Sequence, residues 1–131
     1  MRVVDTSAVL AALAGRAPAP ELIDTLAKDA DLHAPHLIDV EFLHALRRLS
    51  IANQITPDRA ADARADFAEL TLVRYPHHEL GDRIWELRHN LTAYDAAFVV
   101  LAEVLGVPLV TCDARLASSA GHAATVELFS P

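Results

Sequence analysis

The sequence contains little cysteine, glycine or aromatic residue, and it has no long hydrophobic run. Cys112 is the single cysteine among 131 residues, which excludes an intrachain disulfide and a cysteine zinc cage. The longest apolar run, residues 96–102, is far too short to span a bilayer, and Asp5 interrupts any signal-type segment. We therefore expect a cytoplasmic protein with no membrane partner. The 53% hydrophobic content with only 4 glycines predicts one globular domain over residues 1–131.

Positive charge is also scarce, with 11 Lys and Arg against 18 Asp and Glu and a net charge of −7. This balance argues against a generally basic nucleic-acid binder, although it leaves room for a local basic patch. Lys28 is the only lysine. The remaining cations are arginines, whose planar forks suit phosphate.

Short β-branched runs alternate with helical segments along the whole chain. Strands are predicted at residues 2–5, 32–34, 71–74, 107–111 and 125–128. Helices are predicted at residues 7–14, 21–30, 36–52, 57–69, 79–89, 93–105 and 114–119, with a stiff loop at residues 17–20. The alternation predicts an α/β fold, in which helices cover both faces of a mainly parallel central sheet.

Two aspartates occupy the same kind of position, directly after an apolar strand and directly before a helix. They are Asp5, after Arg2-Val3-Val4, and Asp113, after Leu109-Val110-Thr111-Cys112. Each could simply cap the helix that follows it. Right-handed crossovers place all parallel strand ends at one edge of a sheet, where ligands bind in open α/β folds. We therefore expect Asp5 and Asp113 to be neighbours if their strands are adjacent.

Two further acids lie on helices. Glu41 sits at the edge of a helical face expected to bury Ile38, Phe42, Ala45 and Leu49. It could reach into a cleft, or it could pair with His44 at the surface. Asp95 begins an apolar helix, where Thr92-x-x-Asp95 also has the form of a capping box.

Several carboxylates held together repel one another and raise each other's pKa, unless a cation neutralises them. Oxygen donors without supporting cysteine or histidine favour Mg²⁺ or Mn²⁺ over Zn²⁺. Such ions orient and activate a water for attack on a phosphodiester. The hypothesis is that Asp5, Glu41, Asp95 and Asp113 form one catalytic metal site.

Other residues give weaker signals. The seven histidines form no metal motif, and Trp85 and Tyr94 are expected to pack rather than to stack on bases. The candidate phosphate contacts are the arginines close in sequence to the candidate acids: Arg47, Arg48, Arg88 and Arg115.

Four segments together resemble the PIN domain family. They are the opening Val3-Val4-Asp5-Thr6-Ser7-Ala8, the helix of Glu41 ending Ala45-Leu46-Arg47-Arg48-Leu49, Leu91-Thr92-Ala93-Tyr94-Asp95-Ala96, and Leu109-Val110-Thr111-Cys112-Asp113-Ala114-Arg115-Leu116. The compact length resembles VapC-type toxins of toxin–antitoxin pairs. The resemblance implies a three-layer PIN-like fold and a Mg²⁺- or Mn²⁺-dependent endoribonuclease that cleaves structured RNA, often tRNA or rRNA. It also implies a homodimer, or a larger toxin–antitoxin assembly, held inactive by a VapB-type antitoxin.

The sequence departs from many relatives at two points. His44 replaces a small polar residue three positions after Glu41, and no further acid follows Asp113 until Glu127. The sequence therefore leaves two alternatives open, a site with one well-held ion and a site with two. The hydroxyls of Thr6, Ser7 and Thr111 are expected to orient the carboxylates.

Two other functions fit parts of the sequence. A PIN-like binding or regulatory module could keep the fold without cleaving RNA, although all four acids are present. An aspartate-dependent phosphatase or receiver domain would also use Asp5. The phosphatase, however, needs a second Asp where Ser7 stands, and both generally need a late lysine.

Overall fold

The computed structural model of the protein describes residues 1–17 and 19–130, so Pro18 of the expected loop lies outside the described residues. Its centre is one parallel sheet with strand order β3-β2-β1-β4-β5. The strands are β1 (Arg2–Val4), β2 (Leu32–Pro35), β3 (Leu72–Tyr75), β4 (Leu109–Thr111) and β5 (Val126–Leu128).

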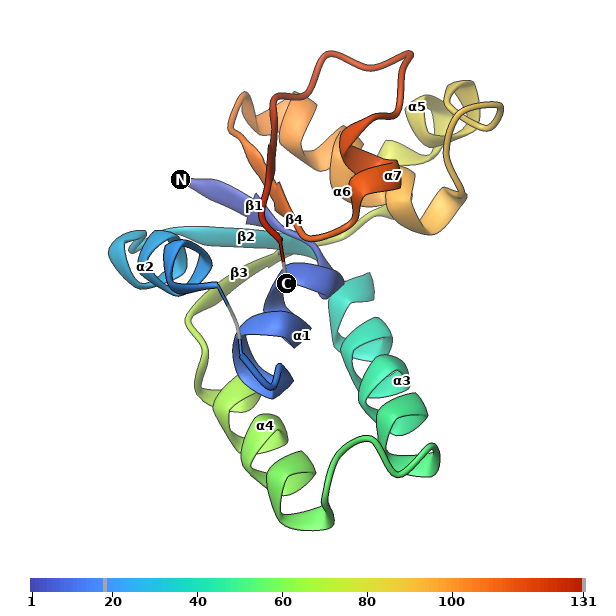
Figure 1. Cartoon of the computed structure of the whole chain (residues 1–131). Helices are drawn as coiled ribbons and strands as arrows, with labels where there is room; N and C mark the ends of the chain where they lie inside the picture. Colours follow the sequence, from blue (N-terminus) through green and yellow to red (C-terminus); the bar gives the residue numbers. More distant parts are fainter. Residues whose placement is uncertain (18, 131) are drawn as a thin grey trace.

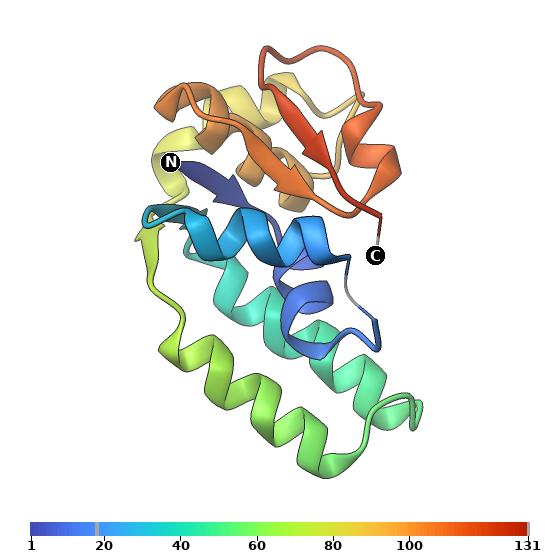
Figure 2. The same cartoon turned by 60° about the vertical axis from the view of Figure 1, so that its left-hand side comes forward.

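Helices connect the strands in every crossover. They are α1 (Thr6–Ala14), α2 (Pro20–Lys28), α3 (Leu37–Ile51), α4 (Pro57–Glu69), the 3₁₀ turn η1 (His78–Leu80), α5 (Gly81–Glu86), α6 (Ala93–Leu105) and α7 (Ala114–Ala117). Figures 1 and 2 show α1 to α4 on one side of the sheet and α5 to α7 on the other. The predicted α/β fold with helices on both faces is confirmed.

The chain order reverses between β1 and β4. From β1 the chain moves outward through β2 to β3, then returns through α6 to β4 on the other side of β1. Val3 is paired with His33 of β2 and with Leu109 of β4. Such a reversal leaves a crevice at the carboxyl ends of the two central strands, where open α/β sheets bind ligands.

The core fills the space between the sheet and its covering helices. Val3 and Val4 are fully buried, as are all residues of the α6 segment 96–102 to within 2% exposure. This explains why α6 is apolar all round: a helix packed between the sheet and other elements has no solvent face over that stretch. No helix in the described part of the chain is both long and apolar enough to cross a membrane.

Helix α3 buries a slightly different face from the one predicted. Ile38, Phe42 and Leu46 are buried, whereas Ala45 and Leu49 are only partly covered. Phe42 stacks on Phe67 of α4 with ring centroids 4.1 Å apart. Ala45 instead lines the cavity described below.

The predicted helix at residues 79–89 was wrong in extent. A 3₁₀ turn occupies His78–Leu80, and α5 ends at Glu86. Leu87 is buried, and Asn90 donates a hydrogen bond to the carbonyl of Ala120. These tertiary contacts hold residues 87–91 in a turn where the sequence pattern alone suggests more helix.

Candidate active site

A cavity of about 640 Å³ opens at the carboxyl ends of β1 and β4. All four predicted acids line it, although they come from four distant segments of the chain. We call this group the acidic cluster: Asp5, Glu41, Asp95 and Asp113. The remaining lining residues are Thr6, Ser7, Leu10, Leu37, Val40, His44, Ala45, Arg48, Tyr94 and Phe98.

Asp5 both caps α1 and faces the cavity. Its Oδ1 accepts hydrogen bonds from the Ala8 backbone N–H at 2.9 Å and from the Ser7 hydroxyl at 2.7 Å. Its Oδ2 accepts a short hydrogen bond from the Thr111 hydroxyl at the end of β4. The side chain is therefore fixed from both central strands, and each carboxylate oxygen has more than one lone-pair direction with which to accept bonds.

Ser7 and Thr111 also join the two strand ends. The Ser7 oxygen accepts from the Cys112 backbone N–H at 2.9 Å, and the Thr111 oxygen accepts from the Asp113 N–H at 2.9 Å. Thr111 is fully buried. The predicted hydroxyls thus position Asp5 and the backbone at Asp113 together.

Glu41 is held by Thr6. The Thr6 hydroxyl donates to Glu41 Oε1 at 2.7 Å, so the alternative pairing with His44 is not the one formed. A bidentate pair holds the start of the same helix, because Arg74 of β3 donates to both oxygens of Asp39 at 2.7 and 2.8 Å. These contacts fix α3 against the sheet with Glu41 at the cavity.

Asp95 and Asp113 are placed by helix starts. The Thr92 hydroxyl accepts from the Asp95 N–H at 3.1 Å as the N-cap of α6, which leaves the Asp95 carboxylate available to the cavity. Asp113 caps α7 by accepting from the Arg115 N–H at 2.9 Å. The Arg115 guanidinium also lies 3.5 Å from Asp113 Oδ2. Capping and cavity lining are therefore compatible at these positions.

Burial is the main electrostatic effect on three of these acids, Asp5, Glu41 and Asp95. It raises the pKa of Asp5, which is only 6% exposed, and the negative charge of Asp95 raises that pKa further against the opposing hydrogen bonds. Burial likewise raises the pKa of Glu41, where the Thr6 bond opposes it and Asp95 adds to it. Burial and then the charge of Asp113 raise the pKa of Asp95. Mutual repulsion of this kind favours binding of a positive ion.

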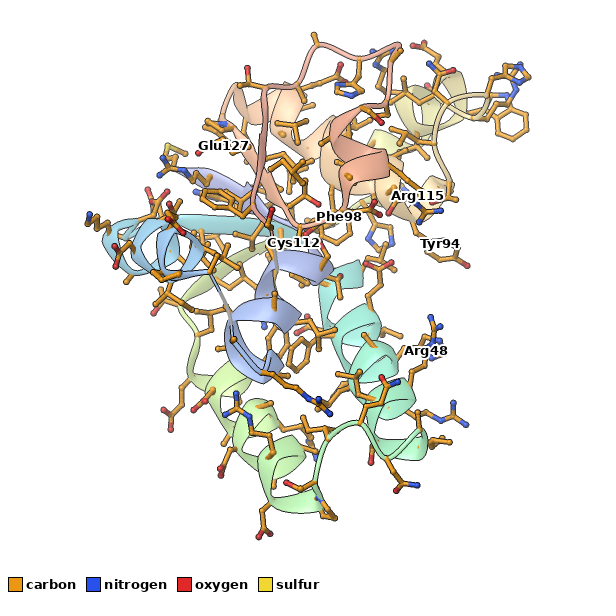
Figure 3. All side chains as sticks on the ribbon, viewed as in Figure 1. Arg48, Tyr94, Phe98, Cys112, Arg115 and Glu127 are labelled. Carbon is orange, nitrogen blue, oxygen red and sulfur yellow. The ribbon has the colours of Figure 1, made fainter. Side chains whose placement is uncertain are left out.

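The candidate arginines separate into two pairs. Arg48 lines the cavity, and Arg115 is bonded to the acidic cluster through Asp113. Arg47 and Arg88 are exposed and do not line the cavity. Arg88 instead lies over the Trp85 ring, 4.6 Å from its centroid. Figure 3 shows Arg115, Tyr94 and Arg48 along the same side of the molecule, on α7, α6 and α3.

The expectation that Tyr94 and Trp85 are packing residues was wrong, because their exposed fractions are 62% and 67%. The buried residues of α6 are 96–102, and α5 packs mainly against α6. Tyr94 and His44 are cavity residues that were not assigned to the site from the sequence. Their positions next to Asp95 and one turn after Glu41 are the signals that could have found them.

The acidic cluster offers only carboxylate oxygens as metal ligands. Hard divalent cations such as Mg²⁺ prefer this type of ligand. Across residues 1–17 and 19–130, no three or more His, Cys, Asp or Glu side chains are already close enough to form a complete metal site. Binding of one ion would require the carboxylates to draw together. Glu127, the next acid after Asp113, bonds to Arg2 at 3.0 Å and does not line the cavity.

Comparison with known proteins identifies the family. Residues 2–121 match the PIN domain family. The chain is 42% identical over 127 residues to Ribonuclease VapC1 of Mycobacterium tuberculosis, covering 96% of each. It is 44% identical over 119 residues to Ribonuclease VapC9 of the same organism, covering 91% of each. The chain therefore belongs to the PIN domain family, among its VapC-type members.

Two solved structures share the fold. PAE2754 from Pyrobaculum aerophilum is 27% identical, with a TM-score of 0.63 over 88% of this chain and 81% of that one. VapC20 of Mycobacterium tuberculosis, described as a sarcin–ricin loop cleaving toxin, has a TM-score of 0.68. It is 19% identical and covers 94% of this chain and 97% of that one. The chain thus spans nearly the full length of these relatives.

Proposed function

We propose that this protein is an endoribonuclease toxin of the VapC type that uses Mg²⁺ or Mn²⁺. The observation that carries the proposal is the convergence of the acidic cluster on one cavity at the β1–β4 reversal. The VapC ribonucleases that resemble this chain over at least 91% of its length support the reaction class. The substrate would be an RNA phosphodiester.

The residues of the cavity would have three different roles. Asp5, Glu41, Asp95 and Asp113 would hold the ion, which supplies charge stabilisation and activation of a water when bound. Thr6, Ser7 and Thr111 keep two of these carboxylates oriented through the hydroxyl bonds described above. Arg48 and Arg115 would contact RNA phosphates at the edge of the cavity, whereas the placement of Arg47 and Arg88 does not support that role.

The direct test is cleavage of total RNA in the presence of Mg²⁺ or Mn²⁺. Asp5→Asn and Asp95→Asn should each reduce cleavage by about 10²-fold or more, because a carboxylate that would hold the ion is lost, and with it the charge stabilisation that the ion would supply. Asp62→Asn, on the exposed side of α4, is the matched control and should cleave normally. Unchanged metal-dependent cleavage by both site variants would overturn the proposal.

The same variants distinguish a catalytically silent module. Calorimetric titration with Mn²⁺ should show binding by the wild-type protein and the Asp62→Asn control, and weaker binding by Asp5→Asn. A scaffold without catalytic function has no need to bind the ion. Mapping RNA ends after brief expression would then identify the cleaved site.

We also propose that the protein forms a homodimer and is inhibited by a VapB-type antitoxin. Exposed apolar side chains on α3, Val40, Leu43 and Ile51, support a surface that a partner covers. Light scattering of the purified protein tests the dimer, and co-expression with a small upstream reading frame tests the inhibitor. A monomer that no neighbouring gene product inhibits would contradict both statements.

A further inference from the structure

Tyr94 is the most exposed aromatic side chain at the cavity. It occupies the second position of α6, directly before Asp95, and 62% of its surface is accessible. Most of the Tyr94 surface is therefore uncovered at the cavity, where its ring offers a flat apolar face to a ligand.

Trp85 provides the contrast. It is equally exposed, at 67%, but the Arg88 guanidinium covers its ring at 4.6 Å and donates a hydrogen bond to its backbone carbonyl. Trp85 does not line the cavity. The Trp85 ring thus has a partner within the chain and lies away from the cavity, whereas Tyr94 lines the cavity.

Tyr94 lies beside the acidic cluster and near two arginines, Arg48 and Arg115, which we call the basic margin. On α3, Val40, His44 and Arg48 follow one another at intervals of four residues and line the same cavity. Arg115 lies beside Asp113 with a side chain that is 91% exposed. Figure 3 shows Tyr94 between these two arginines along the side of the molecule. The ring is thus placed next to the reacting centre with a cation on either side.

We propose that Tyr94 is a stacking platform for a base of the RNA strand, next to the phosphate that is cleaved. The inference rests on the proposed ribonuclease function. Stacking on tyrosine supplies affinity with little preference for sequence, because every base has a flat face. The two arginines bind the phosphates on either side of the stacked base.

This platform also defines the class of RNA that fits. A base inside an A-form helix is stacked on both faces and cannot place one face on a protein ring. The cavity volume of about 640 Å³ lies within the range of small-molecule sites, which suits one unstacked nucleotide better than a duplex. The substrate segment is therefore an unpaired nucleotide in a loop, bulge or single strand.

Binding of short RNA tests the proposal separately from cleavage. Every variant carries Asp95→Asn, which the proposed function predicts to be inactive, and gel analysis confirms that the RNA stays intact. The probes are a fluorescein-labelled adenylate decamer and an abasic ribose-phosphate decamer, measured by anisotropy with Mg²⁺. Tyr94→Leu should weaken binding of the adenylate decamer by about tenfold. Tyr94→Phe, which keeps the ring, should bind within about twofold of the parent.

The controls separate stacking from a structural role. Trp85→Leu should leave binding unchanged, and the abasic decamer should bind equally to the parent and to the Tyr94→Leu variant. An unchanged affinity of Tyr94→Leu for adenylate overturns the proposal, as does an equal loss for the abasic decamer. Failure of the parent to bind adenylate also overturns it. Cleavage of RNA by the Asp95→Asn parent would instead show that the proposed role of the acidic cluster is wrong.

Discussion

The acidic side chains of the cavity have two roles at once, and hydrogen-bond geometry makes that possible. One oxygen of Asp5 accepts the capping N–H of α1, while the other accepts the Thr111 hydroxyl at the end of β4. Asp113 caps α7 and still lines the cavity. A carboxylate has about four lone-pair directions, so a cap leaves room for a cation. The capping and functional interpretations of these residues are therefore complementary.

The raised pKa of Asp5 predicts how this site affects stability. Burial moves its pKa above the ordinary value of 3.8, so between the two values the folded protein binds more protons than the unfolded chain. The free energy of unfolding therefore decreases as pH rises through that window. In EDTA at neutral pH, Asp5→Asn should raise the melting temperature, because an uncharged side chain avoids the cost of burying the carboxylate charge.

The difference between Asp5→Asn and wild type should diminish as pH falls through the pKa of Asp5. Scanning calorimetry from pH 4 to 8 measures it, with Asp62→Asn as the control. Added Mn²⁺ should raise the melting temperature of wild type more than that of Asp5→Asn. A less stable Asp5→Asn protein in EDTA at neutral pH would contradict the argument.

Among the elements, α6 contributes both to the hydrophobic core and to the lining of the cavity. It packs buried residues 96–102 against the sheet and presents Tyr94 and Asp95 at the cavity from its first turn. Its ends are specified locally, by the Thr92 cap and by Gly106 in the left-handed region at φ 65°. The buried middle of α6 thus connects the stability of the core to the position of one carboxylate.

Two glycines at helix ends should respond in opposite directions to alanine. Gly106 has positive φ, so Gly106→Ala should destabilise the protein by about 1 kcal/mol, although no atom lies within 4 Å of the added Cβ. Gly81 has helical φ of −57° and equally open surroundings. Gly81→Ala should stabilise by about 0.4–1 kcal/mol through the unfolded state. Urea denaturation measures both, and changes of equal sign would show that backbone conformation is not the deciding factor.

For the molecule as a whole, the net charge is negative, but two positively charged side chains lie at the cavity. The chain carries −7 overall, yet Arg48 and Arg115 lie at the cavity where a phosphate strand would approach. A bound cation would neutralise part of the acidic cluster between them. Repulsion from the rest of the surface acts at longer range and is screened by salt.

The dependence of RNA binding on salt concentration measures how strongly the two arginines attract the RNA phosphates. Two phosphate contacts should give a slope of about −1.4 for the logarithm of the binding constant against that of salt concentration, at about −0.7 per single-strand contact. Arg48→Ala should reduce the slope by about half, whereas Arg47→Ala should not change it. The assay uses Asp95→Asn protein and the adenylate decamer. A flat response in the parent would count against a basic margin.

The sequence alone was enough to predict the order of the strands and helices and to indicate the four candidate acids. Alternating β-branched runs and helical segments predicted the parallel α/β sheet, because periodicity and crossover handedness are local or general rules. Repeated strand–acid–helix settings indicated Asp5 and Asp113. The tertiary structure brings them with Glu41 and Asp95 to one cavity, and their function there is still a prediction.

Contacts between distant segments decide which side chains near the acids face the cavity. Arg47 and Arg48 are adjacent in sequence, but a helix turns about 100° per residue, so only Arg48 lines the cavity. Contacts of Leu87 and Asn90 also end α5 early. Exposure of Tyr94 likewise follows from what the neighbouring elements leave uncovered. These features depend on contacts between distant segments, which no local pattern contains.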